Sequence, residues 1–143
     1  MGNLSVFLKP NKLVRKNEFY PATKSIVDEE GNPVEWEIRP VETAESERIR
    51  RSCYHSVPIP GKRNRTEDKF DANEYLLKMV TSAIVYPDLN DAELQDSYGV
   101  RTPEDLLLQL IDNPSEYADL QNFVTELSGF DREIADDVED AKN

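Results

Sequence analysis

The chain has 143 residues, of which 38% are hydrophobic and 32% are charged, and its formal net charge at pH 7 is -12. This length suits one domain with one modest core. The negative charge disfavours general binding to nucleic acid or anionic lipid, because an acidic surface repels phosphates. No apolar run approaches the roughly 20 residues of a membrane helix, and the N-terminus lacks the apolar stretch of a signal peptide. The single cysteine, Cys53, fits a reducing compartment, so we expect a cytoplasmic protein.

Charge is distributed unevenly along the chain. Between Arg48 and Lys69 there are seven basic and two acidic residues, whereas from Asp112 to Asn143 there are ten acidic and two basic residues. The sequence therefore predicts a molecule with a basic middle and an acidic, solubilising end.

The first 41 residues predict an arm followed by a β-hairpin. Residues 1–17 combine a small apolar cluster with four basic residues and are interpreted as an arm. Residues 19–27 and 34–41 favour strands, and residues 28–32 between them are typical of a turn. In the second strand the apolar residues alternate with charged ones, which places Val34, Trp36 and Ile38 on one face. That face needs a helix to cover it.

Capping residues and apolar spacing predict two helices next. Thr43 is a suitable N-cap for a helix that ends near Cys53. Residues 57–65 contain two prolines and a glycine, so we interpret them as a loop. Asp71 and Glu74 then form a capping-box-like pair before a central core helix, whose apolar stripe runs to Ile84 before Pro87 stops it.

Three shorter helices complete the predicted elements. Their expected first residues are Asn90, Thr102 and Asn113, and glycines end the first and the last of them at Gly99 and Gly129. Residues 130–143 are either a marginal amphipathic helix or a solvated tail. The sequence thus predicts a mainly α protein with a small N-terminal β-hairpin (α+β), folded as a compact multi-helix domain. We expect an arm at 1–17, one globular domain at 18–129 (hairpin 19–41, helices 43–129) and an acidic segment at 130–143.

The residue patterns of known catalytic and metal sites are missing from the sequence. His55 is the only histidine and lies two residues from Cys53, but a zinc site needs further ligands that the sequence does not cluster there. The segment that begins at Asp88 resembles a calcium loop at first, but its twelfth position is Gly99 instead of a bidentate glutamate. We therefore predict no metal, no cofactor and no catalytic residues, and expect a protein that is not an enzyme.

The basic run from Lys62 to Arg65 allows two interpretations. It could contact phosphates, but it lacks the interleaved aromatic residues that single-strand binding normally requires. A solvated loop is the favoured interpretation, and we expect no nucleic-acid partner.

Four segments carry a recognisable family pattern. They are VEWEIR at 34–39, VYPDLNDAELQDSYGV at 85–100, EY at 116–117 and SGFD at 128–131. In this order and spacing they resemble the XkdN-like tail assembly chaperones of phages and defective prophages. The resemblance extends from Phe7 to about Asp131, and the sixteen residues at 85–100 are its most specific part.

The resemblance implies a chaperone without ATPase activity that associates with the phage tape measure protein before the tail tube polymerises around it. Such a client is a long helical chain whose apolar stripes aggregate if they are unprotected. A small and highly charged partner can cover these stripes and keep the complex soluble. The resemblance itself assigns no binding residue.

Two sets of residues are candidates for the contact with the client. The first is Tyr86, Leu89, Leu94 and Tyr98, which mix aromatic and leucine side chains with acids; the alternative is that they pack back onto the central helix. The second set lies in the N-terminal arm, where Leu4, Phe7 and Leu8 could insert into a neighbour. Self-association is a further expectation.

Two other functions fit the same sequence. A structural tail component would be found in purified phage particles, which mass spectrometry detects. An acidic inhibitor of a host DNA-binding protein, suggested by the net charge of -12, would bind its target in a salt-sensitive way.

Overall fold

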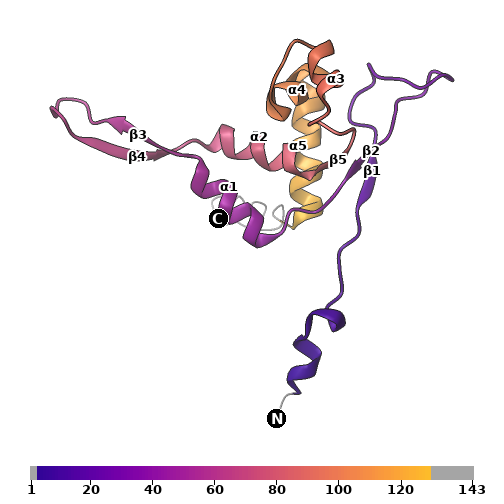
Figure 1. The fold of residues 1–143 in the computed structure, drawn as a ribbon, viewed down its shortest axis with the longest axis horizontal. Helices are drawn as coiled ribbons and strands as arrows, with labels where there is room; N and C mark the ends of the chain where they lie inside the picture. The colour runs from indigo at the N-terminus through magenta and orange to yellow at the C-terminus, as the bar shows by residue number, and fades with distance from the viewer. Residues whose placement is uncertain (1–2, 130–143) are drawn as a thin grey trace, which may run out of the picture.

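The computed structural model describes residues 3–129, and the predicted acidic segment at 130–143 lies outside them (Figure 1). The described part begins with an arm that contains two short 3-10 helices, η1 (Leu4–Phe7) and η2 (Lys9–Asn11). The arm extends away from the helices of the molecule (Figure 1).

A three-stranded antiparallel sheet follows the arm. Its strands are β1 (Glu18–Tyr20), β2 (Trp36–Ile38) and β5 (Ile84–Tyr86), in the spatial order β1-β2-β5. The predicted N-terminal hairpin is therefore present, but each of its strands has only three residues. In the register of the sheet, Phe19 lies opposite Glu37, which in turn lies opposite Tyr86.

A second, two-stranded sheet projects from the molecule on its own. It consists of β3 (Tyr54–Pro58) and β4 (Thr66–Phe70), which pair from Tyr54↔Phe70 to Pro58↔Thr66. Figure 1 shows this hairpin extending to the left, beyond the ends of α1 (Thr43–Ser52) and α2 (Ala72–Ala83).

Helix α2 is central and packs against α1, α4 (Pro103–Leu110) and α5 (Pro114–Ser128). The remaining helix, α3 (Ala92–Ser97), is short and leads into α4. Side-chain caps define most helix starts, because the Asp71, Asp91, Thr102 and Asn113 side chains accept backbone N–H groups that have no partner within the helix.

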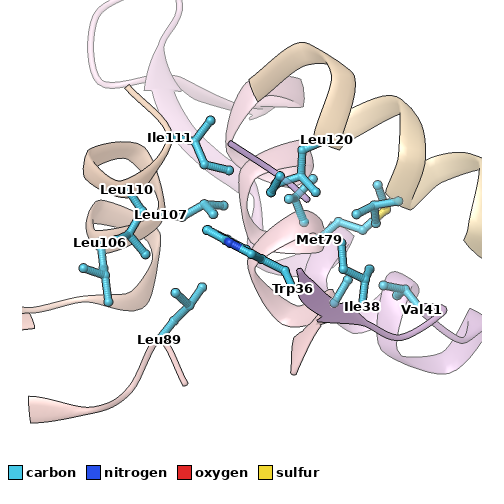
Figure 2. Close-up of a cluster of buried hydrophobic side chains, with 14 residues drawn as sticks. Trp36, Ile38, Val41, Met79, Leu89, Leu106, Leu107, Leu110, Ile111 and Leu120 are labelled. Carbon is cyan, nitrogen blue, oxygen red and sulfur yellow. The ribbon is translucent and has the colours of Figure 1, made fainter. Parts of the chain in front are cut away.

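The hydrophobic core lies between the three-stranded sheet and the helices. Trp36 and Ile38 are 1% and 0% exposed, which confirms the face predicted for the second strand. Figure 2 shows Trp36 between the leucines of α4 and Met79 of α2. On the neighbouring strand β1, Tyr20 lies opposite Trp36 in the register, and its ring stacks on Phe123 of α5 with the centroids 4.3 Å apart.

The predicted fold class was wrong, because strands are not confined to an N-terminal hairpin. Within residues 3–129, five strands in two antiparallel sheets give a mixed α+β fold. Residues 57–65 were predicted to be a loop, but their first two residues belong to β3. Pro58 is tolerated there because it is the last residue of a strand in a two-stranded sheet.

The second missed strand is β5. The central helix was expected to run to Pro87 and ends instead at Ala83, because the β-branched pair Ile84-Val85 and Tyr86 continue as a strand beside β2. A proline also disfavours helical backbone at the residue before it, here Tyr86.

Three predicted helix starts also need correction. Glu42, not Thr43, is the N-cap of α1 and makes no side-chain capping bond, and Asp91, not Asn90, caps α3. Only half of the predicted capping box forms at α2: Asp71 accepts the N–H of Glu74, whereas the Glu74 carboxylate binds His55 and Lys78.

Among residues 3–129, no helix combines the length and the apolar character needed to cross a lipid bilayer.

Candidate protein-binding surface

Cys53 and His55, the two residues considered for a zinc site, take separate roles. Cys53 is fully buried at the C-terminus of α1, and its carbonyl accepts the N–H of Asp71. His55 lies on β3, where its Nε2 contacts the carboxylate of Glu74. Within residues 3–129, no three side chains of the metal-binding types are grouped.

Glu74 connects the base of the β3–β4 hairpin to α2. Its carboxylate lies 2.8 Å from the ammonium group of Lys78 and also contacts His55. Hydrogen bonds from Lys78 and then from His55 lower the pKa of Glu74 below its ordinary value.

In the segment that resembles a calcium loop, the carboxylates accept hydrogen bonds from backbone N–H groups. Asp88 accepts the N–H of Asn90 and Asp91 accepts the N–H of Leu94, at 3.0 and 2.8 Å. These bonds shape the turn before α3 and cap that helix.

The N-terminal arm presents the largest concentration of exposed apolar side chains in the described chain. Leu4 and Phe7 are 78% and 77% exposed, and Leu8 is 58% exposed. The same arm also exposes Val6, Leu13 and Val14. A segment that exposes so many large apolar side chains to water is typical of a protein interaction site.

Arg15 fastens the base of this arm to the body of the molecule. Its Nη1 donates to the carbonyls of Ser128 and Leu127 at 2.7 and 3.4 Å, and its Nη2 donates to the carbonyl of Val41 at 3.4 Å. The cation therefore satisfies carbonyls at the C-terminus of α5, where the helix dipole also favours positive charge.

The second predicted set of contact residues is divided between surface and interior. Tyr86 and Tyr98 are 57% and 41% exposed. Leu94 is partly buried against the core, and Leu89 is a core residue at 3% exposure. Leu89 also lines a groove of about 420 Å³ between α1, α2 and the start of α4, together with Ile49 and Ile84.

The charge distribution adds a third feature. The β3–β4 hairpin carries Lys62, Arg63 and Arg65 in the loop at its tip, where residues 59–65 include no acidic residue. In contrast, residues 71–129 contain twelve acidic and only two basic residues. The basic part of the chain is thus the tip of the projecting β3–β4 hairpin. Acidic residues predominate from α2 onward, and not only from Asp112 onward.

Comparison with known proteins identifies the class to which this fold and these surfaces belong. The sequence profile of the phage XkdN-like tail assembly chaperone proteins matches residues 4–142, so the chain belongs to this family of tail assembly chaperones, as the sequence motifs predicted.

Relatives in Bacillus subtilis strain 168 support this assignment. The chain is 25% identical over 138 residues to the phage-like element PBSX protein XkdN. The match covers 96% of this chain and 92% of XkdN. It is also 26% identical over 141 residues to the protein YqbN, covering 99% and 93% of the two chains. The crystal structure of YqbN superposes with a TM-score of 0.75 over 91% of this chain and 98% of that one, at 21% identity, which shows a shared fold.

Proposed function

We propose that this tail assembly chaperone binds the tape measure protein of its phage in the host cytoplasm and keeps it soluble until the tail tube polymerises around it. The observation that carries this proposal is the exposed apolar arm on a member of the tail assembly chaperone family. Nothing in the proposed role requires a catalytic residue or a cofactor.

The arm has the chemistry that an amphipathic helical client needs. Leu4, Phe7 and Leu8 can pack against the apolar stripe of a client helix, because all three side chains are large, apolar and exposed. Desolvating three large apolar side chains is worth roughly 1.5–3 kcal/mol for each one that becomes fully buried. The acidic helices behind the arm then keep the complex in solution.

Tyr86 and Tyr98 form a second proposed contact, at the beginning and the end of the segment 86–98. Tyrosine combines a large apolar ring with a polar hydroxyl and is enriched at protein interfaces. Leu94 supports this segment from the partly buried side, and Leu89 belongs to the core, so we exclude Leu89 from the direct contact.

Co-expression with the tape measure protein tests the proposal. We expect the triple variant Leu4→Ala/Phe7→Ala/Leu8→Ala to capture much less tape measure protein and to leave more of it insoluble. Tyr86→Ala/Tyr98→Ala should lower capture to a smaller extent.

Leu108→Ala provides the matched control, because Leu108 is 40% exposed on α4 and belongs to neither set. Undiminished capture by both multiple variants, with the same fold by circular dichroism, would contradict the proposed contacts. Loss of solubility of the client in the absence of the chaperone must also be observed.

A further inference from the structure

The β3–β4 hairpin is attached to the molecule only at its base. Phe70 anchors it, since its ring centroid lies 5.1 Å from that of Tyr54 and 5.8 Å from that of Tyr75. The guanidinium of Arg50 covers the same ring at 5.4 Å. Beyond this anchor, Val57 and Ile59 are the only residues of the hairpin that are partly buried.

The hairpin nevertheless remains paired up to its tip. Pro58 lies opposite Thr66, and the N–H of Ile59 donates to the carbonyl of Arg65 at 3.0 Å. A two-stranded hairpin with so little cover is marginally stable by itself in water. A second surface packed against the hairpin would bury part of it and stabilise the ladder.

The charges at the tip define the chemistry of that surface. Lys62, Arg63 and Arg65 make no ion pair and no side-chain hydrogen bond with any other residue between 3 and 129. Three unpaired cations within four residues favour an acidic partner surface.

The chain itself carries such a surface at a distance from the hairpin. Residues 88–105 contain six acidic residues and one basic residue, Arg101. Glu93, Asp96 and Asp105 are exposed there and have no capping role. In Figure 1 the hairpin projects to the left, whereas α3 and α4 lie at the upper right, so a hairpin does not reach the acidic end of its own chain.

We propose that the basic hairpin of one copy docks onto the acidic α3–α4 end of a second copy. The contact joins two different surfaces, so it is head-to-tail, and its repetition builds an open chain of subunits unless the geometry closes a ring. The apolar side chain of Ile59 at the tip adds contact area to the ion pairs. This self-association does not depend on the client and goes beyond the proposed function.

Two charge-neutralised variants test the contact in a single measurement. The hairpin variant is Lys62→Gln/Arg63→Gln/Arg65→Gln, and the end variant is Glu93→Gln/Asp96→Asn/Asp105→Asn. By sedimentation velocity at low ionic strength, we expect the natural chain to form concentration-dependent oligomers that dissociate when salt is added. Each variant alone should be monomeric.

An equimolar mixture of the two variants gives the decisive result. Only one complementary pair of surfaces remains in the mixture, namely the hairpin of the end variant and the acidic end of the hairpin variant. We therefore expect a 1:1 dimer that grows no further. A control variant, Lys9→Gln/Lys12→Gln/Lys16→Gln, removes three cations from the arm and should self-associate like the natural chain.

Any of three results would overturn the proposal: a natural chain that stays monomeric, a hairpin variant that still forms the natural oligomers, or a mixture that forms no dimer. Binding of the monomeric natural chain to a DNA or RNA duplex, lost in the hairpin variant, would assign the hairpin to nucleic acid instead. None of these measurements includes the tape measure protein, so they succeed or fail independently of the proposed function.

Discussion

Trp36 shows at the scale of single residues how the core is specified. It alternates with charged neighbours on β2, so the sequence alone places it on the covered face. Which element covers it is not encoded locally, because α4 reaches Trp36 from some seventy positions further along the chain (Figure 2). Side-chain direction was therefore predictable, and the packing partner was not.

Replacement of Trp36 by alanine should lower the free energy of unfolding by about 3–5 kcal/mol, since it leaves a large cavity between α2, α4 and the sheet. Urea unfolding followed by far-ultraviolet circular dichroism measures this change. Phe19→Ala, on the neighbouring strand, removes a side chain that is 61% exposed and should change the same quantity by less than about 0.5 kcal/mol. Equal decreases in the free energy of unfolding in the two variants would show that Trp36 is no more buried than Phe19.

At the scale of elements, the helices were more predictable than the strands. Thr102, Asn113 and Gly129 define helix ends through short-range contacts with their own chain, so these boundaries are visible in the sequence. Strand β5 is only three residues long and exists because β2 lies beside it. Pairing of this kind depends on the tertiary structure, so the β-branched pair Ile84-Val85 does not predict the strand by itself.

The missed hairpin is a different case, because a sequence signal was present. Pro60-Gly61 is typical of a turn, and short runs with aromatic or β-branched residues flank the loop on both sides. Prolines are typical of loops, but Pro58 here is the last residue of strand β3. Leu4, Phe7 and Leu8, which the sequence offers as candidate contacts, are exposed on the arm. The sequence does not show how the arm is held, because the contacts of Arg15 span 112 and 113 positions.

A pH-dependent link holds the start of α5 against the segment that follows β1. The carboxylate of Glu116 accepts the N–H of Lys24 and the hydroxyl of Thr23, at 2.8 and 2.7 Å. These bonds, the backbone N–H first, lower the pKa of Glu116 below its ordinary value. The stabilisation is therefore complete above the pKa that Glu116 has in the unfolded chain. It is lost as the pH falls through the lower pKa that Glu116 has in the folded chain.

We expect Glu116→Gln to be less stable than the natural chain at pH 7 and to approach it in stability as the pH falls below the lowered pKa of Glu116. Thermal unfolding of both proteins across this range measures the difference. Asp119→Asn, one turn further along α5, removes the same charge without breaking these two hydrogen bonds and is the matched control. A constant difference between Glu116→Gln and the natural chain at all pH values would contradict the proposed link.

At the scale of the whole molecule, Arg15 joins three parts that are distant in sequence: the arm, the segment before α1 and the end of α5. The N–H of Val41 completes this junction by donating to the Ser128 hydroxyl at 2.8 Å. The planar guanidinium fork can reach carbonyls on both sides, which a lysine ammonium does less well.

Arg15→Gln should lower the free energy of unfolding by about 1 kcal/mol, because it leaves carbonyls at the end of α5 without their donor. It should also speed hydrogen exchange at the Val41 amide, measured by NMR. Arg15→Lys keeps the positive charge at the helix C-terminus and should give an intermediate result. Unchanged exchange at Val41 in both variants would mean that Arg15 does not hold the junction.

The same junction can form only late in the synthesis of the chain, because its parts lie at the two ends of the described sequence. Arg15 leaves the ribosome early, but its carbonyl acceptors at Leu127 and Ser128 are synthesised more than a hundred residues later. Glu116 likewise arrives long after Thr23 and Lys24. The β3–β4 hairpin and α2 can form from neighbouring residues while translation proceeds. Tyr20 of the N-terminal sheet, in contrast, stays without its α5 partner Phe123 until α5 has emerged.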